Sequence, residues 1–288
     1  MNSLEVIDTF PAFQDFWAAA QGRSLDEQIE QWATGYMSHW PELLEIQIQD
    51  YSEQNLDWKQ VAKERVFPDL QERYQAMLEA RSNLLRLGPV IFSKAEQILS
   101  FKTSTCFVIY VGIGCGAGWV TKFQNKYSIL FGLENIAECG WSDSESIKGL
   151  IAHEIGHLAH FTLRTRNNKK LESGAWWQLY TEGVAQYCES LVNGSSHQES
   201  RDGDWLVWCR QNTSRLASQF VRAADEGQPV HPFFGSWFEI DGHSETGYFL
   251  GHEIVRTLAK EMNFQDIALL DDFEKCSREI LEEMITKG

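Results

Sequence analysis

The sequence predicts an α+β protein, on the basis of three observations. Residues 1–95 show the spacing of apolar and charged residues that is typical of helices. Two short runs rich in β-branched and aromatic residues follow, with a glycine-rich stretch between them, and a largely apolar helical pattern comes next. We therefore expect a helical N-terminal region at 1–95 and a second domain at 96–288.

The helical spacing of the N-terminal region is clearest at 25–32, 42–51 and 70–87. Pro41 and Pro68 stand where helices can begin, because proline fits the first helical position. This region shows no set of residues that would hold a ligand. We expect it either to cover a cleft or to serve as a packing partner.

Two runs with strand character flank the glycine-rich stretch, Cys106–Val111 and Tyr127–Phe131. The glycines are Gly112, Gly114, Gly116 and Gly118. The stretch is not a phosphate loop, because neither Lys-Ser nor Lys-Thr follows and no helix signal opens after it. It is either part of an edge strand that pairs with an extended substrate or a hairpin with a loose loop.

The five residues from His153 to His157 match the pattern H-E-x-x-H. Residues i and i+4 are neighbours on a helix, so His153 and His157 can bind one metal ion. Glu154 can then take a proton from a metal-bound water. Zinc with three protein ligands keeps one position open and lowers the pKa of that water to about 7. The pattern therefore indicates metal-assisted hydrolysis; the alternative is a solvated turn with two aligned histidines.

The residues before this motif predict that it lies within a helix. The run 147–152 is largely apolar, as in a half-buried helix. Ser142 and Glu145 match a capping box, and Asp143 adds negative charge to the first turn. We expect the motif about three turns into this helix.

Glu182 is the favoured third metal ligand. The aromatic stretch 176–180 leads into it, and we expect Glu182 in the first turn of a second helix. A glutamate on a helix packed against the first completes a His-His-Glu set, whereas its alternative role is to complement the helix dipole. Glu172 and Glu189 are further candidates in less apolar surroundings.

His160 is not expected to bind the metal. It lies seven residues after His153, which is roughly 10 Å along a helix axis and too far for both to reach one ion. The extended pattern H-E-x-x-H-x-x-G-x-x-H also fails, because His160 replaces its glycine and Leu163 its last histidine. We expect His160 to be a neighbour of the site.

From His153 to Glu189 the chain resembles the gluzincin metallopeptidases, especially aminopeptidase N and its relatives. Their signature Glu-Gly-x-Ala-x-Tyr is matched by residues 182–187. A closer resemblance is to a bacterial family of predicted zinc-dependent proteases of unknown function, which covers roughly the C-terminal two-thirds of the chain. The resemblance implies a zincin-like catalytic domain at 96–288 with zinc bound by His153, His157 and Glu182 and with Glu154 as general base.

A second segment, Gly247–Val255, resembles the Tyr-x-x-Gly helix of the same peptidases. The resemblance implies that Tyr248 donates a hydrogen bond to the oxyanion that develops from the substrate carbonyl. The alternative is a buried aromatic residue at a helix start. His252 shares the helical face of Tyr248 and could assist, whereas His231 and His243 lie in the preceding loop.

Residues 132–135 match only superficially the Gly-x-Met-Glu-Asn motif with which these aminopeptidases hold a free substrate amine. The methionine is absent and the stretch is close to the metal helix, so this role is not assigned to Glu134. Endopeptidase and small-peptide hydrolysis stay open.

The C-terminal part is expected to end in helices at 249–262 and 264–285. A loop at 227–242 precedes them. Its aromatic residues either line a substrate pocket or fold onto the core. They are Phe233, Phe234, Trp237 and Phe238, beside His231.

Composition excludes several classes of protein. The chain of 288 residues is 43% hydrophobic, enough for one or two domains with a core. No stretch approaches the roughly 20 apolar residues of a membrane span, and residues 1–8 lack the features of a signal peptide. The six cysteines show no C-x-x-C pair, which favours the cytoplasm, and the net charge of −16 argues against a nucleic-acid partner. The oligomeric state stays open.

The predicted function is zinc-dependent hydrolysis of peptide bonds in a peptide or protein substrate. One alternative is a binding protein, such as a chaperone, that keeps the metal-site fold without turnover; Glu154 argues against it, because a structural site needs no base. The other is a zinc hydrolase of a non-peptide amide or ester.

Overall fold

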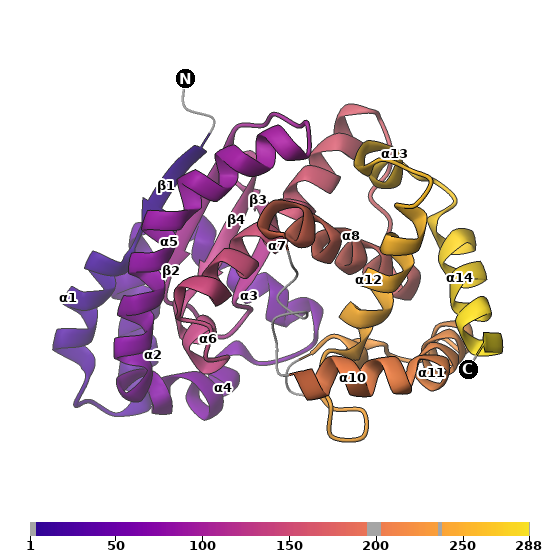
Figure 1. Cartoon of the computed structure of the whole chain (residues 1–288). Coiled ribbons are helices and arrows are strands. Elements are labelled where there is room, and N and C mark those ends of the chain that lie inside the picture. The colour runs from indigo at the N-terminus through magenta and orange to yellow at the C-terminus, as the bar shows by residue number, and fades with distance from the viewer. Residues whose placement is uncertain (1–3, 195–202, 236–237, 288) are drawn as a thin grey trace. The chain divides into compact units, whose positions relative to one another are not determined.

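The computed structural model describes residues 4–194, 203–235 and 238–287 of the chain (Figure 1). Within these ranges the fold is mixed α+β, with one four-stranded sheet and many helices. The predicted fold class is therefore confirmed at this level. None of the described helices is both long enough and apolar enough to cross a membrane.

The sheet has the strand order β1-β2-β4-β3. Strand β1 (Leu4–Asp8) runs parallel to β2 (Thr105–Tyr110), and β2 runs parallel to β4 (Lys126–Gly132). Strand β3 (Gly118–Phe123) pairs antiparallel with β4. All six residues of β2 are buried, so this strand lies at the centre of the hydrophobic core.

The sequence predicts a helical region at 1–95, but this region begins with a strand, β1. Leu4 pairs with Thr105 and Asp8 with Ile109, so the whole strand follows β2 in register. Its partner lies about a hundred residues further along the chain. Pairing at that distance leaves no local signal in five residues, and strand preference depends strongly on such neighbours.

The glycine-rich stretch contains a third strand that the sequence analysis does not predict. Its last glycine, Gly118, begins β3, and a two-residue connection at Gln124 and Asn125 leads into β4. Both connecting residues have positive φ, 51° and 60°, which is the geometry of a type I′ hairpin turn. Strands β3 and β4 therefore form a hairpin, β3 is an edge strand of the sheet, and Gly112, Gly114 and Gly116 lie in the loop before it.

Helices at 25–32, 42–51 and 70–87 are confirmed as α2, α3 and α5. Pro41 is the first residue of α3, whereas Pro68 lies in a 3-10 turn just before α5. The helices before the second strand are α1 (Phe10–Ala20), α2 (Leu25–Gln31), α3 (Pro41–Glu53), α4 (Trp58–Val61) and α5 (Leu70–Ile98). Short π-helical and 3-10 segments at Trp32–Tyr36, Met37–His39, Ala62–Val66 and Phe67–Asp69 join them.

Helices dominate the rest of the chain. They are α6 (Leu133–Glu138), α7 (Ser144–Arg166), α8 (Ala175–Asn193), α10 (Gly203–Gln211), α11 (Thr213–Asp225), α12 (Thr246–Leu258), α13 (Phe264–Ala268) and α14 (Phe273–Lys287), with a 3-10 turn at His231–Phe233. The expected helix at 264–285 is wrong as one element, since α13 and α14 are separate. The Arg164 guanidinium donates to the carbonyls of Ala268 and Leu270, which stabilises the break between them.

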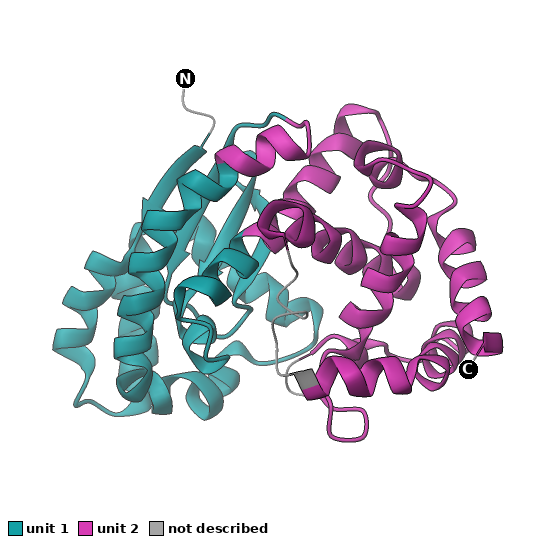
Figure 2. Ribbon diagram, viewed as in Figure 1, with its two compact units in different colours: residues 1–92, 102–151 teal, residues 93–101, 152–288 magenta. Residues whose placement is uncertain are grey.

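The chain divides into two compact units (Figure 2). Unit 1 comprises residues 1–92 and 102–151 and contains the whole sheet; unit 2 comprises residues 93–101 and 152–288. The boundaries of these compact units differ from the division expected from the sequence, between residues 95 and 96. The expected domains, 1–95 and 96–288, stay a prediction.

Candidate metal centre

Helix α7 carries the H-E-x-x-H motif, and Asp143 caps its start. The backbone N–H groups of Glu145 and Ser146 donate to Asp143 Oδ1 at 2.8 and 3.1 Å, and the Ser146 hydroxyl donates to Oδ2 at 2.6 Å. The expected capping box with Ser142 is therefore wrong, because the adjacent aspartate already satisfies the free N–H groups. The motif does lie about three turns into the helix, as expected.

Glu182 lies in the middle of α8, whereas the sequence predicts it in the first turn of that helix. Helix α8 begins at Ala175, so the aromatic stretch 176–180 is itself helical. Trp177 packs against His160 with ring centroids 5.2 Å apart, and Tyr180 is fully buried. Because burial of these rings extends the helix toward its N-terminus, Glu182 does not serve to complement the dipole of a first turn.

Glycines allow the helices that carry the candidate residues to lie in close contact. A Cβ atom on Gly156 of α7 would stand 2.8 Å from both Ala185 Cα and Cys188 Cβ of α8. A Cβ atom on Gly183 of α8 would stand 2.2 Å from the carbonyl oxygen of Gly251 of α12. These close contacts pack α8 against both α7 and α12. Packing therefore explains the glycine of the Glu-Gly pattern, Gly183, and that of the Tyr-x-x-Gly pattern, Gly251.

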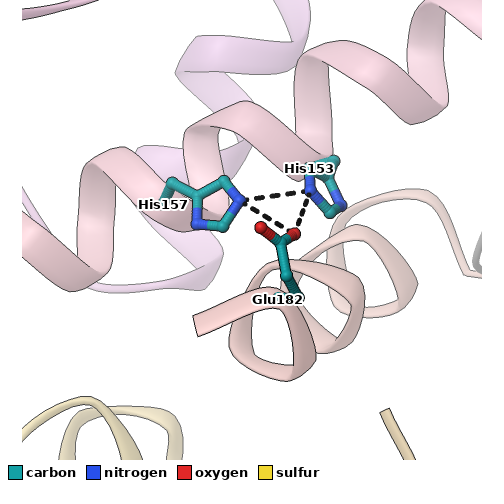
Figure 3. Close-up of side chains that lie close together, drawn as sticks. All are labelled: His153, His157 and Glu182. Carbon is teal, nitrogen blue, oxygen red and sulfur yellow. Dashed lines mark hydrogen bonds and ion pairs between the residues drawn. The ribbon is translucent and has the colours of Figure 1, made fainter. Parts of the chain in front are cut away.

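The structure brings His153, His157 and Glu182 together (Figure 3). Glu182 Oε2 lies 3.2 Å from His153 Nε2 and 3.3 Å from His157 Nε2, and the two ring nitrogens are 3.2 Å apart. A tetrahedral zinc site with bonds of about 2.0–2.1 Å has ligand-to-ligand distances of about 3.3 Å. The three ligand atoms therefore fit three corners of such a site.

The contacts of Glu182 Oε2 with the two imidazole rings do not meet the geometry of ordinary hydrogen bonds. Within the described ranges, Glu182 Oε2 has no hydrogen-bond partner of normal geometry, although two ring nitrogens lie within 3.3 Å of it. Three ligand atoms that bind one metal ion direct their lone pairs at the ion and not at one another, which gives short distances without hydrogen bonds. The donor set of two imidazoles and one carboxylate suits zinc.

The charges of the cluster depend on one another. Burial alone would raise the pKa of Glu182, but the positive charges on His157 and His153 hold it well below its usual range. Burial alone would lower the pKa of His153, but contact with the Glu182 carboxylate raises it to about 9. Without a metal ion, therefore, the Glu182 carboxylate and the His153 ring form a partly buried ion pair.

Glu154 is buried beside this cluster with an exposed fraction of 4%. Burial raises the pKa of its carboxyl group, partly offset by the charges of His157 and His153. Its Oε2 has no hydrogen-bond partner in the part of the chain that the structure describes. A carboxylate oxygen in this position is available to accept a proton.

Tyr248 also lies at this cluster, as the resemblance implies. It is in the first turn of α12, and its ring centroid is 5.9 Å from that of His153 and 5.7 Å from that of Phe234. Tyr248 is half-buried, whereas the alternative predicts a buried aromatic residue. His252, one turn further along α12, is 7% exposed.

The other candidate residues are not part of the cluster. His160 is fully buried against Trp177, and burial lowers its pKa to about 3. Glu172 forms an exposed ion pair with Lys170, whereas Glu189 is buried further along α8. In the loop before α12, the His231 ring contacts that of Phe238 at a tilted angle, with centroids 4.5 Å apart. His243 stacks on Trp208 with ring centroids 3.8 Å apart.

The aromatic loop before α12 packs largely onto the core of unit 2. Phe233 and Phe234 are buried, and their ring centroids lie 5.3 and 6.4 Å from that of Phe220. Phe238 is exposed, and Trp237 lies outside the described residues. For Phe233 the packing alternative is therefore correct, whereas the buried ring of Phe234 also lies 5.7 Å from that of Tyr248.

One residue of the site is missed by the sequence analysis. The side-chain amide nitrogen of Gln186 lies 3.4 Å from His153 Nδ1, on the side of the ring away from Glu182. A signal for it was available, because Gln186 follows Glu182 by four residues and therefore shares its helical face.

Glu134 has a defined structural role in unit 1. The backbone N–H groups of Gly112 and Gly114 donate to its two carboxylate oxygens at 2.7 and 3.1 Å. The side chain is 1% exposed, and burial raises its pKa to about 7. A Cβ atom on Gly112 would come within 2.9 Å of Glu134 Oε1, so this close approach requires glycine.

No protein-family model, curated protein or solved structure matches this chain. The resemblance to gluzincins therefore depends on the motifs and stays a prediction.

Proposed function

We propose that this protein is a zinc-dependent peptidase with a zincin-like catalytic region in which His153, His157 and Glu182 bind the metal. The observation that carries the proposal is the set of distances among the three ligand atoms, 3.2, 3.2 and 3.3 Å. These distances fit zinc with a fourth position left for solvent or substrate. Glu154 beside the ligands supports a catalytic site over a purely structural one, because a structural zinc site has no use for a base.

Zinc, when bound, supplies Lewis acidity toward a water molecule and toward the carbonyl oxygen of the substrate. Glu154 accepts a proton from the attacking water as the water oxygen bonds to the carbonyl carbon. Glu154 then returns this proton to the amide nitrogen as the carbon–nitrogen bond breaks. Its unpartnered, buried oxygen supports this role.

Tyr248 stabilises the negative charge that develops on the carbonyl oxygen by donating a hydrogen bond from its hydroxyl. The position of Tyr248 supports this assignment, because its ring contacts the ring of His153, with centroids 5.9 Å apart. The close packing of Gly183 against Gly251 fixes α12 against the helix that carries Glu182. The base and the oxyanion donor thus come from different helices that meet at the same cluster.

The decisive experiment is Glu154→Gln. The amide cannot accept the proton, so peptide cleavage should fall by about 100- to 10,000-fold while the zinc content stays at the wild-type level. Elemental analysis of the purified protein gives the zinc content, and cleavage of an unbiased peptide library gives the activity. Glu145→Gln, an exposed change in the first turn of the same helix, is the matched control and should alter neither.

Loss of zinc in the Glu154→Gln protein would contradict the assignment of Glu154 as a base that is not a ligand. A wild-type protein that holds zinc but cleaves no peptide would favour a binding protein, such as a chaperone. Ester and non-peptide amide libraries profiled in parallel distinguish a hydrolase of those substrates.

A further inference from the structure

Gln186 is the polar side chain on the face of His153 opposite to the ligand cluster. His153 Nε2 faces Glu182 and His157, and His153 Nδ1 faces the Gln186 amide at 3.4 Å. Gln186 is 5% exposed and lies one helical turn after Glu182 on α8. The same helix therefore contacts both nitrogens of one imidazole ring.

Binding a metal through Nε2 determines what Nδ1 must do. The Nε2 lone pair goes to the metal, so the proton of the neutral ring sits on Nδ1, which then needs a hydrogen-bond acceptor. Gln186 Oε1 has no hydrogen-bond partner among the described residues. Rotating the amide by 180° exchanges its nitrogen and oxygen and leaves its shape unchanged, which presents Oε1 to the Nδ1–H group.

Glutamine can meet this requirement. The Gln186 amide lies within hydrogen-bond distance of Nδ1, at 3.4 Å, and either end of the amide can face the ring. Once Nε2 is a ligand, the rotated amide accepts from Nδ1–H. A carboxylate at this position could only accept, and an apolar side chain could do neither.

We infer that Gln186 is a positioning residue for the metal, which orients His153 and holds its proton on Nδ1 so that Nε2 is free to bind zinc. This inference deepens the proposed function and rests on it. Gln186 contacts neither the substrate nor the reacting atoms in this role; it acts through His153. Its effect should therefore appear in metal affinity, whether or not a substrate is known.

The test compares the zinc affinity of the full-length wild type with that of Gln186→Met and Gln186→Glu, by competition with a chromophoric chelator. Methionine keeps the length of the side chain but removes the acceptor, so its affinity for zinc should fall by about 10- to 100-fold. Glutamate keeps an acceptor for Nδ1–H, so its affinity should equal or exceed that of the wild type. Ser190→Ala is the control one turn further along α8. It removes only a hydroxyl that donates to the backbone carbonyl of Gln186, so it should leave the zinc affinity unchanged.

Each outcome separates this inference from the proposed function. Wild-type protein that binds no zinc overturns both. Wild-type protein that binds zinc, with Gln186→Met binding it equally well or Gln186→Glu losing as much affinity as Gln186→Met, overturns the role of Gln186 alone. Should Gln186→Met fail to fold, NMR of the zinc-loaded wild type decides, because a His153 Nδ1–H proton that exchanges with solvent as fast as one without a hydrogen bond would overturn the inference.

Discussion

Two glutamates, Glu134, buried in unit 1, and Glu182, partly buried in unit 2, are held by different partners. Glu134 in unit 1 accepts hydrogen bonds from the backbone N–H groups of Gly112 and Gly114, and burial raises its pKa to about 7. For Glu182 in unit 2, burial acts in the same direction, but the charges of His157 and His153 lower the pKa below its usual range. The comparison shows that backbone donors can position a buried carboxyl group without keeping it ionised, whereas imidazole partners keep it anionic.

The largest expected difference between the two glutamates is in zinc binding. Glu182→Ala should weaken zinc affinity by roughly 100- to 1000-fold, because it removes one of three ligands that share the binding free energy. Glu134→Ala should leave zinc affinity unchanged, and so should Glu172→Ala, which removes only an exposed ion pair with Lys170. Chelator competition measures all three variants. If Glu172→Ala lost zinc affinity and Glu182→Ala kept it, the third ligand would be Glu172 and not Glu182.

The next effect concerns stability and separates the two sites by pH. The folded-state pKa of Glu134, about 7, lies above its ordinary value of 4.5, so its contribution to stability is complete below pH 4.5. That contribution is lost as the pH rises to about 7, a change of about 3 kcal/mol for a fully buried group. Glu134→Gln cannot titrate, so its free energy of unfolding should decline less over this range.

Urea unfolding at a series of pH values checks this expectation. The control is Glu79→Gln, an exposed change on α5 in the same unit, which should keep the wild-type pH profile. A Glu134→Gln protein with the wild-type profile would show that Glu134 is not the source of the pH dependence.

The smallest effect concerns the glycines. In unit 1 they donate hydrogen bonds to a carboxylate, whereas in unit 2 they allow helices to touch. Gly183→Ala would place a Cβ atom 2.2 Å from the Gly251 carbonyl oxygen, and overpacking of this kind costs about 1–3 kcal/mol. Gly22→Ala enters open space and should change stability by less than about 0.5 kcal/mol. Thermal or chemical denaturation compares them, and equal stability would show that α8 and α12 can move apart at no cost.

Much of the candidate site could be predicted because its chemistry is local in the sequence. The spacing of His153 and His157 places both on one face of a helix, and the apolar residues before them predict that helix. Glu182 could be selected from its surroundings, but its place within α8 could not. Aromatic residues that are buried against distant elements extended that helix toward its N-terminus.

The parts of the fold that the sequence analysis missed depend on distant partners or on competition between neighbours. Strand β1 exists because it pairs with β2, a hundred residues away. Asp143 caps α7 in place of Ser142, since both are good capping residues and only the geometry of the chain selects one. Gln186 follows Glu182 by four residues, but it was overlooked because glutamine is common on helices and the sequence does not show that His153 lies beside it.

The three helices that meet at the candidate metal centre also determine when it can form. Along the chain, Glu182 lies 25 positions after His157, and Tyr248 lies 66 positions after Glu182. Bringing such distant segments together costs loop entropy before their contacts repay it. We therefore expect His153 and His157 to become neighbours early, when α7 forms. Glu182 and then Tyr248 should join them only as folding nears completion.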